Sequence, residues 1–248
     1  MPFTFSHPAA VLPLVKSKRL PLSLSALVMG SIIPDFEYFF RMRSSVSHTL
    51  AGTLYFNMPL CFLVLILFHA VVRDPLITHL PGFLKARFIR YRGTDWLRYF
   101  RTHWIAVILS VLIGIASHLL WDSFTHRTGF FVRHFSILQK PLGSPGHLIA
   151  LYRLFQHCST IAGGLIIAGA VLAMPRDSLP EEQPRRWYWP VFFLVTAGLL
   201  VLRRFLWSGT WRLWELAVSS VAAVLGAVVI AGIVDYLQKR RLIPSCGG

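Results

Sequence analysis

The chain has 248 residues, of which 55% are hydrophobic and only 14% are charged, and its mean hydropathy is +0.59. A soluble domain carries about 25% charged residues and a disordered chain has low hydrophobicity, so the composition excludes both classes. The formal charge is +15, but the basic residues flank apolar runs, as in residues 87–101. That placement fits membrane topology and excludes nucleic acid as the partner.

In chain order, a short apolar segment comes first, followed by five longer apolar runs. The segment, residues 20–33, is closed by Pro34 and predicts a half-buried or re-entrant helix. Each longer run approaches the roughly 17–25 helical residues that cross a bilayer. They are residues 53–72, 104–121, 158–174, 187–202 and 213–234. The sequence therefore predicts an all-α polytopic membrane protein of about five transmembrane helices plus an N-terminal half-buried helix.

Composition separates two regions that we expect to form one structural domain. Residues 1–157 carry all ten histidines, whereas residues 158–248 form a three-helix transmembrane region with few ionisable groups inside its apolar runs. Basic residues are nearly equal on the two membrane sides. The dense loop 85–101 and the terminal Lys239, Arg240 and Arg241 favour the cytoplasm for the side opposite the N-terminus. The N-terminal side would then be the outer one.

Most histidines and several acidic residues are expected on that N-terminal side. Two consecutive spans form an antiparallel hairpin, so His48, before the first run, and His118, at the far end of the second, become neighbours. Asp35, Glu37 and Asp122 are expected on the same side. So are seven of the ten histidines: His7, His48, His118, His126, His134, His147 and His157.

The densest motif is SHLLWDSFTH, residues 117–126. It places His118, Asp122 and His126 at successive steps of four, which share one face of a helix. Neighbours four apart can bind one metal ion, but His118 and His126 would be roughly 12 Å apart on a continuous helix. Either His126 serves a second ion, or the helix ends before it, with Gly129 as the cap. Zinc accepts imidazole nitrogen and carboxylate oxygen, and catalytic zinc keeps a position open for water.

Four motifs taken together resemble a known family. They are SHPAAVLP with His7, GSIIPDFEYFFRM with Asp35, SHTLAG with His48, and SHLLWDSFTHRTG with His118, Asp122 and His126. In this order they resemble an uncharacterised family of bacterial membrane proteins, the domain-of-unknown-function family 4184 (DUF4184). The resemblance covers residues 1–157 and extends loosely over the last three runs.

The motif order is similar, more distantly, to membrane-bound metal-dependent hydrolases. Those proteins share an early His, a Pro-Asp turn, a Ser-His or His-Ser element and a later His-x-x-x-Asp. His7, Asp35, His48, His118 and Asp122 match that pattern, whereas His126 matches only DUF4184. Where the hydrolases often carry His-Arg, this chain has Ser44-Ser45-Val46.

The resemblance implies a hydrolase of the bacterial inner (cytoplasmic) membrane, in which metal-activated water attacks an ester or phosphodiester, with a lipid as candidate substrate. Its implied ligands for zinc or a similar divalent ion are His7, Asp35, His48, His118, Asp122 and His126. Asp35 and Asp122 are the candidate catalytic residues, and Asp35 is a ligand, a bridge to a second ion or a general base. The alternative is a non-enzymatic membrane protein in which the His/Asp cluster has a structural, metal-binding or proton-relay role.

Overall fold

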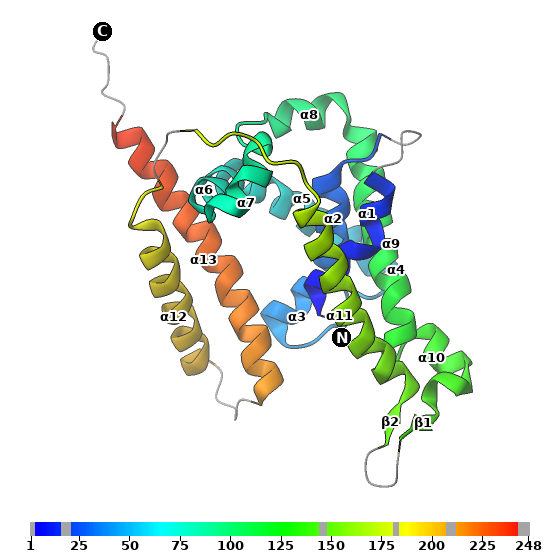
Figure 1. Cartoon of the computed structure of the whole chain (residues 1–248). Helices are drawn as coiled ribbons and strands as arrows, with labels where there is room; N and C mark the ends of the chain where they lie inside the picture. Colours follow the sequence, from blue (N-terminus) through cyan, green and yellow to red (C-terminus); the bar gives the residue numbers. More distant parts are fainter. Residues whose placement is uncertain (1–2, 16–20, 144–147, 181–183, 207–211, 243–248) are drawn as a thin grey trace. The chain divides into compact units, whose positions relative to one another are not determined.

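The computed structural model describes residues 3–15, 21–143, 148–180, 184–206 and 212–242, and most of them are helical (Figure 1). The strands in this part of the chain are β1 (Pro141–Leu142) and β2 (Ile149–Ala150), which pair antiparallel. Five of the described helices are long and apolar enough to cross a membrane. The predicted all-α polytopic membrane fold and its five spans are therefore confirmed.

The first span is one helical stretch, Leu50–His79. It consists of α4 (Leu50–Gly52), a π-helical turn (Thr53–Asn57), α5 (Met58–Leu67), a second π-helical turn (Phe68–Val72) and α6 (Arg73–His79). The other four spans contain α9 (Trp104–Thr125), α11 (Leu151–Leu172), α12 (Tyr188–Leu206) and α13 (Leu213–Leu242). These helices overlap the five predicted runs and mostly exceed them.

Two differences at the ends of the spans have simple causes. Helix α11 begins seven residues before the predicted run at 158, because Arg153 and Gln156 in its first turns interrupt the apolar pattern. Helix α12 continues past residue 202 through Arg203 and Arg204. The guanidinium of Arg203 donates a hydrogen bond to the backbone carbonyl of Phe39 (2.6 Å), so its charged end has a partner.

Shorter elements lie before and between the spans. The N-terminal part holds a 3-10 turn (Thr4–Ser6), α1 (Pro8–Val15), α2 (Leu24–Ile32), a second 3-10 turn (Ile33–Asp35) and α3 (Phe36–Arg41). Helix α2 is the predicted half-buried helix. The connections add α7 (Gly82–Phe88), a 3-10 turn (Ile89–Tyr91), α8 (Trp96–Thr102), α10 (Phe130–His134) and a 3-10 turn (Ser136–Gln139).

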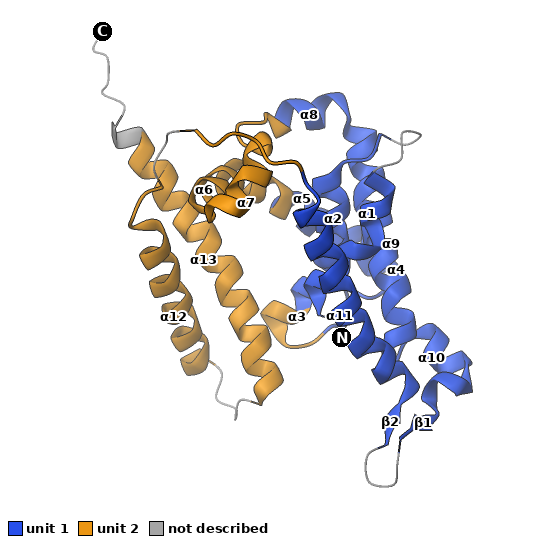
Figure 2. Ribbon diagram, viewed as in Figure 1, with its two compact units in different colours: residues 1–37, 44–63, 97–174 blue, residues 38–43, 64–96, 175–248 orange. Residues whose placement is uncertain are grey.

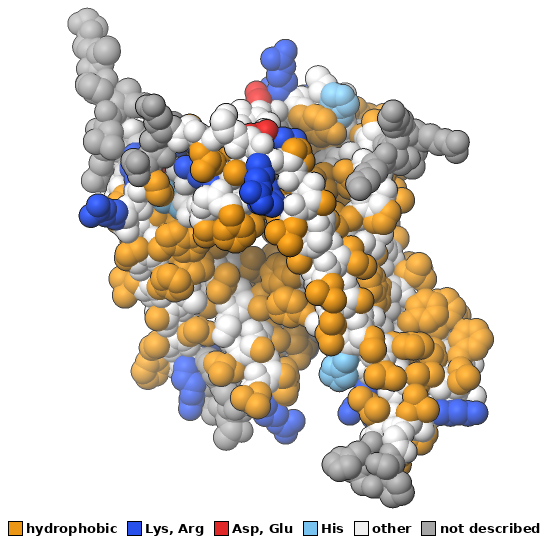
Figure 3. Space-filling model, viewed as in Figure 1, with side chains coloured by type: hydrophobic (Ala, Val, Ile, Leu, Met, Phe, Trp, Pro, Cys, Tyr) orange, Lys and Arg blue, Asp and Glu red, His pale blue; other side chains and the backbone are white. Residues whose placement is uncertain are grey.

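The flanks of the long helices expose large apolar side chains, whereas Lys and Arg gather near helix ends (Figure 3). On α11, Ile161 and Leu165 are 65% and 68% exposed, and on α12 Leu194 and Phe205 are 75% and 82% exposed. A soluble protein rarely exposes contiguous apolar patches of this extent. In a bilayer the same side chains contact lipid.

The chain forms two compact units that interleave along the sequence (Figure 2). Unit 1 comprises residues 1–37, 44–63 and 97–174, and unit 2 comprises residues 38–43, 64–96 and 175–248. Unit 1 therefore contains α1, α2, α9 and α11. Unit 2 contains α6, α7, α12 and α13.

Unit 1 is organised by the crossing of α2 and α9, which pack closely together. A Cβ on Gly30 would lie 2.5 Å from the carbonyl oxygen of Val111, and a Cβ on Gly114 would lie 2.5 Å from that of Leu27. Only glycine allows the two backbones to approach this closely. The crossing therefore fixes the positions of two site residues: Asp35, just after α2, and His118, one turn beyond Gly114 on α9.

Helix α11 holds the N-terminal turn of unit 1. A Cβ on Gly163 would lie 2.7 Å from the Cβ of Ser6. The backbone N–H of Phe3 donates to Thr160 Oγ1 (3.0 Å), and Ser6 Oγ donates to the Thr160 carbonyl (3.0 Å). These contacts position His7, the residue directly after the turn.

Unit 2 packs α12 against α13 around a buried acid. Asp235 is fully buried, and its oxygens lie 3.0 Å from Lys239 Nζ and 3.9 Å from Arg185 Nε. The ring of His79 stacks on Tyr188, with centroids 4.0 Å apart, and accepts the backbone N–H of Arg185 (3.1 Å). This polar cluster connects the end of α6 to α12 and α13.

We expect Gly114→Ala to lower the free energy of unfolding by about 1–3 kcal/mol, because overpacking at the crossing forces the helices apart. Detergent-titrated unfolding, followed by circular dichroism, measures the change. The matched control is Gly169→Ala in α11, where an added Cβ would meet nothing within 4 Å. Equal stability of the two variants would contradict the crossing.

Candidate metal centre

Helix α9 supplies the central pair of the site. His118 and Asp122 lie one turn apart on its buried face, and the helix ends at Thr125 with His126 as its C-cap. The helix thus ends before His126. This is the second of the two alternatives that the spacing of His118 and His126 left open. The prediction that Gly129 caps α9 is wrong: Gly129 is the N-cap of α10, with φ −63°. A Cβ added to Gly129 would lie 2.4 Å from the carbonyl oxygen of Ser123. Only glycine therefore allows the backbone to pass this close to Ser123.

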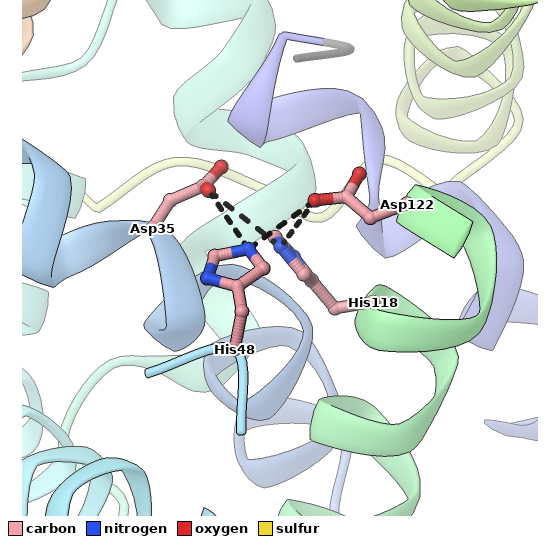
Figure 4. Close-up of side chains that lie close together, drawn as sticks. All are labelled: Asp35, His48, His118 and Asp122. Atoms are coloured by element: carbon pink, nitrogen blue, oxygen red, sulfur yellow. Dashed lines mark hydrogen bonds and ion pairs between the residues drawn. The ribbon is translucent and has the colours of Figure 1, made fainter. Parts of the chain in front are cut away.

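Four side chains from three parts of unit 1 converge (Figure 4). Asp35 ends the 3-10 turn after α2, His48 comes from the loop before α4, and α9 brings His118 and Asp122. One ligand atom from each of the four lies within 4.8 Å of the others.

The distances between these atoms fit a bound metal ion. Asp122 Oδ2 lies 3.3 Å from His48 Nε2 and 3.3 Å from His118 Nε2. Asp35 Oδ1 lies 3.6 Å from His118 Nε2 and 3.9 Å from His48 Nε2. Zinc binds such atoms at about 2.0–2.2 Å, so two ligands of a tetrahedral ion are separated by about 3.4 Å. Four of the six distances among these ligand atoms, 3.3–3.9 Å, lie near that separation.

The atoms of Asp35 and His118 that do not face the centre are held by the protein. Thr4 Oγ1 donates to Asp35 Oδ2, and His118 Nδ1 donates to the Ser31 carbonyl (2.8 Å). Asp35 Oδ1 and His118 Nε2 are buried and have no hydrogen-bond partner among the described residues. Buried polar atoms are normally paired. The hydrogen bonds of Asp35 Oδ2 and His118 Nδ1 are of the kind found in metal sites, where they orient the ligand and fix the imidazole tautomer.

His48 is presented by a loop that sequence reasoning left unexplained. Its Nδ1 lies 2.7 Å from Ser44 Oγ and 3.0 Å from Ser47 Oγ, which directs Nε2 to the centre. The loop itself is held by Glu37, which accepts the backbone N–H groups of Val46 (2.9 Å) and Ser47 (2.8 Å). Burial alone would raise the pKa of Glu37, but these hydrogen bonds lower it to about 2. Glu37 therefore positions His48 as an ionised acceptor.

His7 and His126 complete the cluster around the second oxygen of Asp122. His7 Nε2 lies 3.5 Å and His126 Nδ1 lies 3.4 Å from Asp122 Oδ1. The His7 ring stacks on His118, with centroids 3.9 Å apart. Burial, reinforced by the neighbouring His118, lowers the pKa of His7 to about 3, so its imidazole is neutral and offers a lone pair.

The structure thus brings all six predicted ligands into one cluster. His48 and His126 are each 26% exposed, whereas His7, Asp35, His118 and Asp122 are buried. Of the six side chains, those of His48 and His126 are therefore the ones that reach the surface. Of the other histidines predicted on this side, His134 and His157 are exposed outside the cluster, and His147 lies outside the described residues.

Sequence reasoning missed the residues that support the ligands: Thr4, Ser31, Ser44 and the role of Glu37. None belongs to a periodic pattern, and the proximity of Glu37 to Asp35 in sequence was the one available signal. Their partners are mostly backbone groups, whose positions depend on the fold.

We expect Glu37→Gln to lower the free energy of unfolding by about 1–3 kcal/mol, because buried N–H groups lose their ionised acceptor. It should also weaken metal retention by freeing His48. Unfolding in detergent and bound metal per chain are the two measurements. Glu215→Gln is the control, since Glu215 accepts one backbone N–H at an exposed helix start. If Glu37→Gln behaves like this control, Glu37 does not hold the loop.

The chain matches one family of known proteins over nearly its whole length. A family model described as a domain of unknown function (DUF4184) matches residues 1–237, which include the whole cluster and all or most of every span. No curated protein and no solved structure matches the chain. The chain belongs to the DUF4184 family.

Proposed function

We propose that this protein is a membrane-embedded, metal-dependent hydrolase that cleaves an ester or phosphodiester bond. The observation that carries the proposal is the group of Asp35, His48, His118 and Asp122, whose ligand atoms lie within 4.8 Å of one another. Two imidazole nitrogens and two carboxylate oxygens suit zinc among the divalent ions. The resemblance of the motif order to that of membrane-bound metal-dependent hydrolases, noted from the sequence, supports the same function.

The two acidic residues would have different roles. Asp35 acts as a ligand rather than a general base, because Thr4 occupies its Oδ2 and its Oδ1 faces two histidines. Asp122 is the central ligand. A divalent ion in such a site lowers the pKa of a water to about 7, so no separate strong base is required. Water and substrate would enter past His48 and His126.

A groove beside the cluster supports a lipid-linked substrate. It has a volume of about 530 Å³ and runs between α1, α9 and α11. Its lining residues are Ala10, Ser117, Leu120, Trp121, Phe124, Thr125, Phe155 and Ser159. The ring of Trp121 meets that of His7 edge-on, with centroids 5.7 Å apart. An apolar chain in the groove would thus lie beside Trp121, one side chain away from His7 of the cluster.

The proposal includes a location. We place the protein in the bacterial inner membrane, with the cluster on the outer face. The basic loop 85–101 and the basic C-terminal residues support a cytoplasmic position for the opposite side.

We expect the purified wild-type protein to retain at least one divalent ion per chain, and His118→Ala/Asp122→Ala to lose it. Elemental mass spectrometry after purification without chelator gives the ratio. His157→Ala/Asp177→Ala is the matched control, because it removes an exposed histidine and a partly exposed acid, paired with Arg90, outside the cluster. Background metal in the wild type would leave the structural or proton-relay role instead.

The groove makes a separate prediction about the substrate. Ser159→Phe should fill the groove and raise KM for a phospholipid in mixed micelles by about 10-fold, which corresponds to about 1.4 kcal/mol of lost binding. Hydrolysis of the soluble diester bis(p-nitrophenyl) phosphate should change much less. Ile161→Phe, on the exposed side of the same helix, is the control. An equal effect of Ser159→Phe on both substrates would argue against a lipid in the groove.

A further inference from the structure

We propose that the cluster binds two metal ions bridged by Asp122; this rests on the proposed metal-dependent function and goes beyond it. The two carboxylate oxygens of Asp122 face different partners. Oδ2 lies 3.3 Å from Nε2 of both His48 and His118. Oδ1 lies 3.5 Å from His7 Nε2 and 3.4 Å from His126 Nδ1. Each oxygen therefore has two imidazoles of its own.

One ion cannot be bound by all six residues. The set whose ligand atoms all lie within 4.8 Å of one another contains Asp35, His48, His118 and Asp122, and it leaves out His7 and His126. This set supplies four protein ligands, and zinc expands to five ligands when it takes up a water or substrate oxygen. The first ion would thus keep its four protein ligands and take up one reacting oxygen.

The second subsite has the composition of a catalytic one. His7, His126 and Asp122 Oδ1 supply three protein ligands, and catalytic zinc ions have three protein ligands plus water. His126 is 26% exposed, so the open position faces the entrance. Its Nδ1 also lies 3.2 Å from the carbonyl oxygen of Asp122, and ligation requires the tautomer whose proton is on Nε2.

Burial supplies an independent argument for this subsite. The side chain of His7 is 1% exposed, and neither of its ring nitrogens has a hydrogen-bond partner among the described residues. Asp122 Oδ1 is also buried without a hydrogen-bond partner there. At 3.5 Å the His7 Nε2 and Asp122 Oδ1 atoms do not form a hydrogen bond with each other, and leaving buried polar atoms without a hydrogen bond is unfavourable. A cation between them would satisfy both atoms.

Of the two proposed substrate classes, esters and phosphodiesters, two bridged ions favour the phosphodiester. Paired ions about 3.5–4 Å apart stabilise both the attacking and the leaving oxygen of an in-line displacement at phosphorus. In this hydrolysis the water oxygen forms a bond to phosphorus, the bond from phosphorus to the leaving oxygen breaks, and a water proton ends on the departing alcohol. A carboxylic ester requires only one ion of this kind.

The test is manganese binding by the full-length protein in detergent, measured as Mn²⁺ per chain and by electron paramagnetic resonance. The wild type should bind two Mn²⁺ and give the spectrum of an exchange-coupled pair. His7→Ala should bind one Mn²⁺ and give the hyperfine lines of an isolated ion. His134→Ala, which removes an exposed histidine outside the cluster, should keep the coupled pair.

The outcomes separate the two proposals. One uncoupled Mn²⁺ in the wild type overturns the second ion and leaves the metal-dependent hydrolase in place. No Mn²⁺ in the wild type, with zinc and other divalent ions also at background, overturns both. If His7→Ala does not fold, His126→Ala at the partly exposed entrance replaces it. A coupled pair that survives in every folded variant of the second subsite also contradicts the proposal.

Discussion

The close approach of the α2 and α9 backbones at Gly30 and Gly114 is the constraint on which the rest of unit 1 depends. Lipid tails are as apolar as leucine, so helices in a membrane associate through packing and hydrogen bonds rather than through the hydrophobic effect. Two facing glycines provide the packing. They also bring the Ser31 carbonyl within 2.8 Å of His118 Nδ1. The same crossing that stabilises the helix pair therefore fixes the tautomer of a central histidine.

A cluster of buried ionisable groups is costly in a membrane protein and is expected where function requires it. Here the surrounding structure offsets part of the cost one group at a time. Thr4 binds one oxygen of Asp35, and α11 holds the turn that carries Thr4 through Ser6 and Thr160. Glu37 holds the loop of His48. Once these contacts are made, the remaining unpaired atoms face the centre, where a cation would satisfy them.

The spans and the cluster were predictable from sequence for different reasons. Hydropathy located the spans because each must cover the hydrocarbon core with apolar residues. The proximity of His48 and His118 could be inferred from the antiparallel order of two consecutive spans. That His118 and Asp122 share one helix face could be inferred from their spacing of four residues. Topology placed His7 and Asp35 on the same membrane side, but only the motif order made them candidate ligands, since neither lies on a span.

The remaining features depend on contacts that no local pattern contains. The turn after α9 was misread at Gly129 because a glycine after a helix is typical of a cap, whereas this one is required by close contact with Ser123. The starts of α7 and α8 lie in polar, basic sequence without a clear apolar period. The role of Glu37 depends on backbone N–H groups of a loop, whose direction is decided by the fold.

The arrangement of the six ligands favours local chemistry over proton transport. A relay requires ionisable groups that succeed one another through the membrane. In this cluster His7, His48, His118 and His126 instead surround one carboxylate, that of Asp122. Helix α9 has no ionisable side chain from Trp104 to Ser117, so nothing on it continues the path from His118 toward the other end of the helix. Four imidazoles divided between the two oxygens of a single acid are a ligand set suited to cations, and the proposed reaction would take place where those cations bind.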